Sequence, residues 1–209
     1  MEVYGEKPEK FTAKWWEYVW EYYKWHFISV LFVIFIMVTT FQQCATRPKY
    51  DLQIMIATEQ DIATTQADLL REDAEGIVED CTGNGVNEVY VMPLTLNPDG
   101  DPQVMQVNHT KFTVGLAMPE SYVVIISKKY AEQATGVGFF ENVNVWSSVE
   151  SGEELVSLKG NEKLTALGFD TEDLYLGVVR LDKENKDNEL EFARYENGVL
   201  FAKHLLGLE

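Results

Sequence analysis

The chain has 209 residues, with 17 basic and 34 acidic side chains and a formal charge of −17 at pH 7. Hydrophobic residues make up 46% and aromatic residues 12%, which excludes a largely disordered chain, because such chains have too little apolar surface to bury. The acidity argues against a nucleic-acid binder, since phosphates are neutralised by Lys and Arg. Two cysteines are too few for a disulfide-dense scaffold or a four-cysteine zinc site.

An uncharged apolar segment divides the chain into two parts that differ in charge. Residues 1–49 carry six basic and five acidic side chains, whereas residues 50–209 carry eleven basic and 29 acidic ones, a balance of −18. No Asp, Glu, Lys or Arg occurs from Trp25 to Thr46. About 20 helical residues cross a bilayer core of about 30 Å, so residues 25–46 are predicted to form a transmembrane helix.

The leader before this segment favours a retained signal anchor. The 26 residues before Phe27 are rich in aromatic side chains and as acidic as they are basic, unlike the short basic leader of a signal peptide. A cleaved signal peptide stays open as an alternative. A lipoprotein anchored through Cys44 also stays open, although Phe41-Gln42-Gln43 lacks the small residues expected before a lipidated cysteine.

The flanking positive charges predict the orientation. Four lysines precede the span, and one arginine and one lysine follow it closely: Lys7, Lys10, Lys14 and Lys24, then Arg47 and Lys49. Positive residues stay on the cytoplasmic side, so we expect a single-pass plasma-membrane protein with a cytoplasmic N-terminus and an extracytoplasmic domain at 50–209.

Residues 1–24 are predicted to form a cytoplasmic, aromatic-rich juxtamembrane helix. Tryptophans gather beside the span, where amphipathic rings favour the headgroup level, and the predicted interface residues are Trp15, Trp16, Trp20 and Trp25. On a helix, four charged residues form one polar stripe: Lys14, Glu17, Glu21 and Lys24. The region is interpreted as an interfacial anchor or, alternatively, as a docking surface for another membrane protein.

Beyond Pro48, short apolar runs of strand length alternate with helical periodicity. In chain order, the pattern predicts a strand at 51–57, a helix from Ala63 to Cys81, a strand at 87–94 that ends near Pro93, a helix at 103–117, a strand at 122–126, a short helix at 128–134, a helical turn at 162–167, a strand at 174–181 and a last helix with Phe192, Tyr195, Val199, Ala202 and Leu206 on one face. The rest of 147–173 is expected to wind over the surface.

This order of elements predicts an α/β fold. Strand, helix, strand, helix, strand requires crossover connections, so we expect a three-layer, mostly parallel β-α-β-α-β sheet with helices on both faces. The run Tyr122-Val123-Val124-Ile125-Ile126 is apolar on both faces, as central parallel strands are.

Part of the domain resembles one lobe of the extracellular solute-binding proteins of the type 2 periplasmic class. The resemblance rests on Lys111-Phe112-Thr113-Val114-Gly115-Leu116-Ala117, on Ser121 to Ser127, on Lys129-Tyr130-Ala131-Glu132-Gln133 and on Gly138-Phe139-Phe140-Glu141-Asn142-Val143. It covers roughly 51–146. The aromatic leader and span also resemble small single-pass membrane proteins of Gram-positive bacteria. The family holds its ligand between two lobes, and this chain has residues for one.

A binding site on such a lobe is expected at the carboxyl ends of the strands, where ligands of open α/β sheets bind. The candidate ligand or partner surface comprises Thr58, Glu59, Gln60, Leu94, Thr95, Ser127 and Lys128. Whether another chain supplies a second lobe stays open.

Signs of catalysis, metal binding or a cofactor are thin. The three histidines are His26, His109 and His204, and none has Cys or acidic partners at metal spacing. No nucleophile elbow or phosphate loop occurs, so no enzyme activity, metal or cofactor is predicted. Cys44 and Cys81 are predicted to be free rather than paired with each other.

The favoured function is therefore that of a non-enzymatic, membrane-anchored extracytoplasmic module that binds another protein, within a transport or envelope complex. The alternative is a tethered solute-capture domain derived from periplasmic binding proteins, and an envelope hydrolase is the weakest candidate. A deep pocket at the strand ends would favour solute capture, and a flat apolar patch would favour protein binding.

Overall fold

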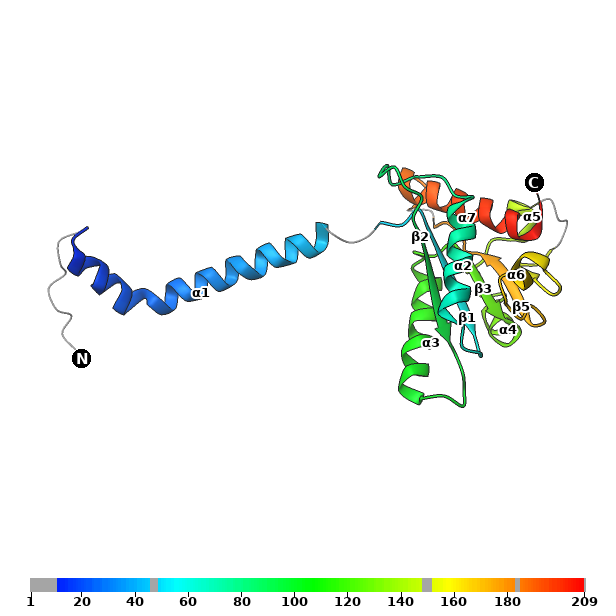
Figure 1. The fold of residues 1–209 in the computed structure, drawn as a ribbon, viewed down its shortest axis with the longest axis horizontal. Coiled ribbons are helices and arrows are strands. Elements are labelled where there is room, and N and C mark those ends of the chain that lie inside the picture. The colour runs from blue at the N-terminus through cyan, green and yellow to red at the C-terminus, as the bar shows by residue number, and fades with distance from the viewer. Residues whose placement is uncertain (1–10, 46–48, 148–151, 183–184, 209) are drawn as a thin grey trace. The chain divides into compact units, whose positions relative to one another are not determined.

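The computed structural model describes residues 11–45, 49–147, 152–182 and 185–208 and contains two compact units, Met1–Pro48 and Lys49–Glu209 (Figure 1). In the first unit the structure describes helix α1 (Ala13–Ala45), which runs without interruption from Ala13, within the predicted leader helix, to Ala45, one residue before the end of the predicted span. The first ten residues of the predicted leader helix lie outside the described residues. The boundary between the units lies within two residues of the predicted start of the domain at residue 50.

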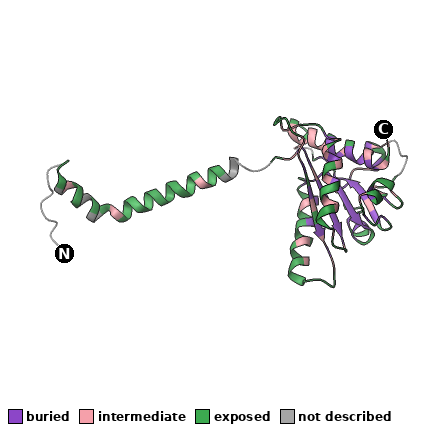
Figure 2. Cartoon of the chain, viewed as in Figure 1, coloured by how far each residue is buried: buried purple, intermediate pink, exposed green. Residues whose placement is uncertain are grey.

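Helix α1 contains one stretch, Tyr23–Gln42, that is long and apolar enough to cross a membrane. None of its residues is buried within the protein, and Figure 2 shows the helix exposed along almost its whole length. The hydroxyl groups of Ser29, Thr39 and Thr40 donate hydrogen bonds of 2.8–2.9 Å to carbonyls of the preceding helical turn. These hydroxyl groups are satisfied without water, as a hydrocarbon environment requires. A membrane anchor and a signal sequence both contain such an apolar helix.

Three of the four tryptophans predicted at the membrane interface are exposed on α1. Trp16, Trp20 and Trp25 expose 59–69% of their surface, and Trp15 is half-buried against Phe11 and Trp16. Trp15, Trp16 and Trp20 precede the apolar stretch and Trp25 lies near its start. Their rings are therefore available to the surroundings of the helix at this end of the stretch.

The second unit is an α/β domain, as predicted. Its elements are β1 (Leu52–Thr58), α2 (Thr64–Glu75), β2 (Val89–Thr95), α3 (Pro102–Ala117), β3 (Val123–Ser127), α4 (Lys128–Ala134), α5 (Val143–Trp146), β4 (Leu155–Ser157), α6 (Glu162–Ala166), β5 (Leu174–Val178) and α7 (Glu189–Leu206). Five strands form one sheet in the order β2-β1-β3-β5-β4. Strand β1 pairs in parallel with both β2 and β3, which confirms the predicted β-α-β-α-β core.

The other half of the sheet differs from the prediction, because the sheet is mixed. Strand β5 runs antiparallel to β3, and the short strand β4 runs antiparallel to β5. Strand β4 lies in a segment that was predicted to wind over the surface, so that prediction was wrong for these residues. Gly177 allows this pairing: a Cβ atom there would lie 2.5 Å from Leu155 and 2.8 Å from the Phe140 ring. The missing side chain lets Leu155 and Phe140 close over the strand.

Two apolar cores cover the two faces of the sheet. Alternate residues of β1 point to opposite faces, with Ile54 and Ile56 in one core and Met55 and Ala57 in the other. Helices α2 and α7 supply the first core, and α3 and α4 supply the second, so helices lie on both faces as predicted. On α7, Phe192 is exposed rather than part of the core face, and Phe201 and Leu205 are buried there instead.

Strand β2 is an edge strand, and Pro93 lies inside it rather than at its end. The N–H of Leu96 donates to the Thr58 carbonyl and the N–H of Asp51 donates to the Glu88 carbonyl, so even-numbered residues of β2 bond to β1. The nitrogen of Pro93 therefore faces the free edge, where its missing N–H costs the sheet no hydrogen bond. The strand continues to Thr95 for this reason.

Buried Asp51 shortens α2 relative to the prediction. The helix ends at Glu75 and not near Cys81. One Asp51 carboxylate oxygen accepts hydrogen bonds of 2.9 Å from the N–H groups of Cys81 and Thr82, and the other accepts one of 2.8 Å from Glu88. These bonds draw the chain after the helix toward the start of β1.

Asn197 on α7 completes this buried network. Its amide nitrogen donates to the carbonyls of Asp51 and Glu79, and its amide oxygen accepts from the Glu79 N–H. Cys81 is a free thiol. Its pKa is raised to about 11, mainly by burial and also by the hydrogen bond and the negative charge of Asp51. The thiol is therefore protonated at neutral pH and a poor nucleophile.

Candidate functional site

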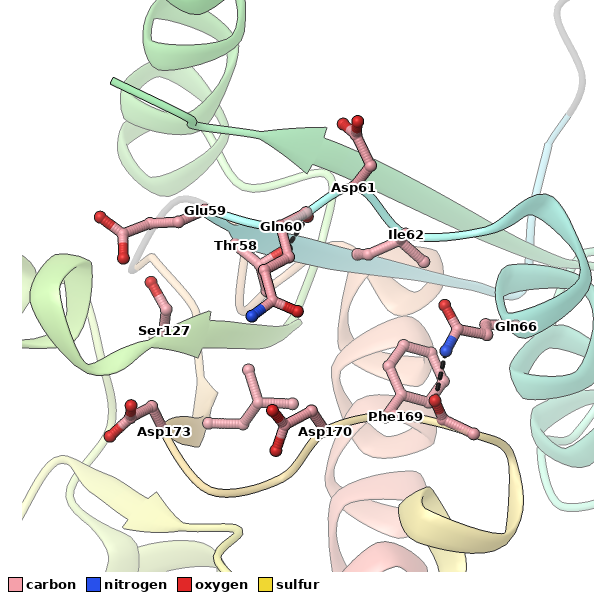
Figure 3. A pocket seen from close by; sticks show the side chains of 12 residues that line it. Thr58, Glu59, Gln60, Asp61, Ile62, Gln66, Ser127, Phe169, Asp170 and Asp173 are labelled. Atoms are coloured by element: carbon pink, nitrogen blue, oxygen red, sulfur yellow. Dashed lines mark hydrogen bonds between the residues drawn. The ribbon is translucent and has the colours of Figure 1, made fainter. Parts of the chain in front are cut away.

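A pocket of about 220 Å³ lies at the carboxyl ends of β1 and β3, on the face of the sheet covered by α2 and α7 (Figure 3). Thr58 ends β1 and Ser127 ends β3, and both line the pocket. Because β1 and β3 are parallel neighbours, these ends meet at one edge of the sheet. Gln60 is fixed beside them by a 2.8 Å hydrogen bond from the Thr58 hydroxyl to the Gln60 carbonyl.

The opposite wall comes from the loop at 168–173. This loop precedes β5, which runs antiparallel to β3 and so begins beside the end of β3, with Leu174 in register with Ser127. The side-chain amide of Gln66 on α2 donates to the Gly168 carbonyl, and its oxygen accepts a 3.0 Å hydrogen bond from the Ala63 N–H. Gln66 therefore ties the loop to the first turn of α2 (Figure 3).

The structure brings four of the seven candidate residues together and separates the other three. Thr58, Glu59, Gln60 and Ser127 line the pocket. Leu94 is buried in the core on the other face of the sheet, since it exposes 1% of its surface.

The remaining two candidates face other hollows. Thr95 lies near the N-terminus of α3, where its carbonyl accepts a 2.8 Å hydrogen bond from the Asn108 amide. Lys128 lines a hollow beside α4 and β4, and its backbone N–H donates to the Asp173 carbonyl.

Sequence reasoning missed eight of the lining residues, and the first of them, Asp61, follows Gln60 directly and adds a carboxylate. Ile62, Phe169 and Leu174 form apolar walls, and Asp170 and Asp173 add two carboxylates from the loop before β5. Phe169, Asp170, Asp173 and Leu174 reach the pocket because β5 runs antiparallel to β3, a direction that the sequence does not signal. Ile62 follows the end of β1, so the rule about strand ends could have found it.

The pocket is acidic. Glu59, Asp61, Asp170 and Asp173 line it, and no lysine, arginine or histidine does. The Lys129 ammonium lies 2.6 Å from the Glu59 carboxylate, and that hydrogen bond raises the pKa of Lys129. Within the described residues, no basic side chain forms an ion pair with Asp61, Asp170 or Asp173. These three carboxylates therefore form no ion pair at the pocket, although the charge of Asp173 acts on the nearby Lys159 and contributes to its raised pKa.

Ser127 has an unusual position at the junction of β3 and α4. It occupies the N-cap of α4, where a serine hydroxyl ordinarily accepts a hydrogen bond from the helix, but its side chain makes no cap bond. Its Oγ is buried without a hydrogen-bond partner among the described residues, and the residue exposes 8% of its surface. A buried hydroxyl without a partner is a destabilising feature, so this one calls for an explanation.

A second candidate surface lies on α3, which has two apolar faces. Phe112 and Leu116 pack against the sheet, whereas four apolar side chains point outward and expose 51–74% of their surface: Val104, Val107, Val114 and Met118. Their spacing of three, seven and four residues places the four on one side of the helix, with Met118 at its C-cap. The exposed Lys111, four residues after Val107 and three before Val114, lies on the same side. Asn108, the first residue of a glycosylation-like Asn-His-Thr sequence, is half-buried and donates to the Thr95 carbonyl.

The histidines and possible metal ligands add no further site. His109 is exposed, whereas His204 is half-buried between Asp73, 3.3 Å from its Nε2, and Lys163, 3.1 Å from its Nδ1. Residue His204 thus has an acidic neighbour that the sequence did not indicate. Among residues 11–45, 49–147, 152–182 and 185–208, no group of three or more His, Cys, Asp or Glu side chains could hold a metal ion.

Comparison with known proteins gives no match: no protein-family model, no curated protein and no solved structure is similar to this chain. The resemblance to one lobe of the solute-binding proteins rests on its residues alone.

Proposed function

We propose that this chain is a non-enzymatic, membrane-anchored module whose extracytoplasmic domain binds another protein, within a transport or envelope complex. The observation that carries the proposal is the outward apolar face of α3, with Val104, Val107, Val114 and Met118. A surface helix ordinarily has one apolar face, toward its own core, and polar residues opposite. A second, exposed apolar face favours a contact with another molecule.

The charge of the domain supports a heterologous partner over a second copy. Residues 50–209 carry eleven basic and 29 acidic side chains, so two copies repel each other. A partner with an apolar strip and a basic rim is complementary to this surface. In this proposal, α1 is the retained anchor, and it keeps the domain close to partners in the same membrane.

Replacing Val107 and Val114 together by aspartate is expected to abolish partner binding without unfolding the domain. Both side chains are about half-exposed, so the carboxylates stay in water in the free protein. Upon binding they would have to be buried without partners, which costs several kcal/mol and lowers the affinity by orders of magnitude. The measurement is quantitative pull-down of the full-length protein from detergent-solubilised membranes, with mass spectrometry of the captured proteins.

Val137→Asp is the matched control, because Val137 is 60% exposed and lies outside α3. Proteins captured by the unmodified chain and by this control, but lost with the α3 variant, are specific partners. Identical capture by all three forms would contradict the assignment of the docking face to α3.

The proposed topology predicts which part of the chain a protease reaches. Because four lysines precede the span and two basic residues follow it, residues 50–209 are expected outside and the N-terminus inside. Protease added to intact cells should digest the acidic domain and leave an N-terminal fragment that contains α1. Full protection of the domain before lysis, with digestion after lysis, would contradict this orientation.

A second candidate function is solute capture, and the pocket at the ends of β1 and β3 favours it. Thr58 and Ser127 lie where ligands of open α/β sheets bind, and this is also where the resemblance to solute-binding proteins implies a site. Capture of a large solute would require a second lobe from another chain, because β4, β5, α6 and α7 complete the first sheet and its core.

A further inference from the structure

We propose that the pocket at the carboxyl ends of β1 and β3 binds an alkylammonium cation, either a free amine or the side chain of a lysine on another protein. This site is distinct from the proposed docking face. Ser127 and Thr58 lie on the sheet face covered by α2 and α7, whereas α3 covers the opposite face.

The charge of the pocket selects a cation. Asp61, Asp170 and Asp173 line it without an ion pair among the described residues, although Lys159 lies close enough to Asp173 for their charges to interact, and Glu59 adds a carboxylate that Lys129 already binds. A concave surface lined by one sign of charge concentrates ligands of the opposite sign. Although α2 begins beside the pocket, and helix N-termini favour anions, the carboxylates repel an anion there.

The size and walls of the pocket suit a short alkyl chain that carries a small charged head group. Its volume of about 220 Å³ lies below the range of about 300–1,000 Å³ typical of pockets for drug-sized ligands. Ile62, Phe169 and Leu174 offer apolar surface for methylene groups. Metal coordination is not what we propose, since the described residues contain no group of ligands that could hold a metal ion.

The unpartnered hydroxyl of Ser127 is the independent sign of a ligand. Ser127 lines the pocket, exposes only 8% of its surface, and has no hydrogen-bond partner for its Oγ among the described residues. Figure 3 shows Ser127 at the end of β3, across from Asp170 and Asp173 on the facing loop. An ammonium group has three donors and no acceptor, which fits carboxylates together with a hydroxyl oxygen. In contrast, the Thr58 hydroxyl already donates to the Gln60 carbonyl.

The test is calorimetric titration of the full-length protein in detergent with two cations, 1,5-diaminopentane and Nα-acetyl-lysine methylamide. We expect saturable binding of at least one of them, weakened by added salt because the carboxylates are exposed. The Nε-acetylated lysine derivative, which lacks the charge, and inorganic phosphate should not bind. Binding of the lysine derivative alone points to a side chain of a partner, and tighter binding of the diamine points to a free amine.

Variants of the pocket make the result specific to it. Asp170→Asn together with Asp173→Asn should weaken cation binding by about tenfold or more, and Ser127→Ala should weaken it by a smaller factor. Asp187→Asn is the matched control, because Asp187 is exposed and does not line the pocket. An unchanged melting temperature will show that each variant is folded.

Absence of saturable binding by the unmodified protein would overturn the proposal, as would an equal loss in the Asp187→Asn control. The α3 variant Val107→Asp/Val114→Asp should bind the cation normally. Failure of the docking face and failure of the pocket are therefore separate results.

Discussion

Ile125→Asp is expected to unfold the 49–209 unit. Ile125 lies at the centre of the sheet, in register with Ile56 of β1 and Leu176 of β5, and exposes 1% of its surface. The new carboxylate would be buried without a partner or be forced to take up a proton, at a cost of several kcal/mol. A domain of typical stability has only about 5–15 kcal/mol to lose. Urea unfolding followed by the fluorescence of Trp146, which is 3% exposed, measures the change.

The control for this experiment is again Val137→Asp, an aspartate on an exposed valine of the same unit. Its free energy of unfolding should change by less than about 0.5 kcal/mol, as is usual for surface substitutions. Trp146 is the only tryptophan after Trp25, so the signal from residues 49–209 expressed alone reports this core. A cooperative transition of Ile125→Asp at the unmodified urea midpoint would contradict the central position of β3.

Asp51→Ala is expected to lower the free energy of unfolding by about 3–5 kcal/mol. The Asp51 carboxylate is fully buried and accepts three backbone hydrogen bonds, from Cys81, Thr82 and Glu88. Without it, three N–H groups at the start of the sheet lose their acceptor. Urea unfolding of the same unit gives the magnitude.

Two further variants separate the hydrogen bonds from the mere loss of a charge. Asp51→Asn keeps one acceptor oxygen, so it should be destabilised less than Asp51→Ala, while its new NH₂ faces an N–H group. Asp187→Ala removes a carboxylate from an exposed loop and should change the stability by less than about 0.5 kcal/mol. A loss below about 1 kcal/mol for Asp51→Ala would show that the loop after α2 holds its position by other contacts.

The parallel half of the fold could be predicted because its signals are local. Strands β1 and β3 are short apolar runs, and Asp101 before α3 accepts a hydrogen bond from the Gln103 N–H, so turn chemistry marks the start of that helix. The antiparallel half carries no such signal. Strand β4 has three residues, too few to show a period of two, and it forms because Gly177 leaves room for Leu155.

Only the part of the candidate site that lies at the ends of the parallel strands could be predicted, because only those strands have local sequence signals. The rule about strand ends located Thr58 and Ser127, but it could not find the loop at 168–173, whose place depends on the direction of β5. Side-chain alternation explains why Leu94 is not in the pocket. Leu94 lies in the core on the opposite face from the pocket, whereas Thr58 on the neighbouring strand lines the pocket.

The orientation of Pro93 has a consequence for the chain in its proposed place at a membrane surface. A protein confined to two dimensions meets its own copies far more often than one in free solution, and an open strand invites their strands to join it. At the free edge of β2, Pro93 has no N–H to donate. The Thr95 carbonyl on the same edge already accepts a hydrogen bond from the Asn108 side-chain amide. An approaching strand would find an interrupted ladder along β2, so this edge of the sheet is a poor template for a further strand.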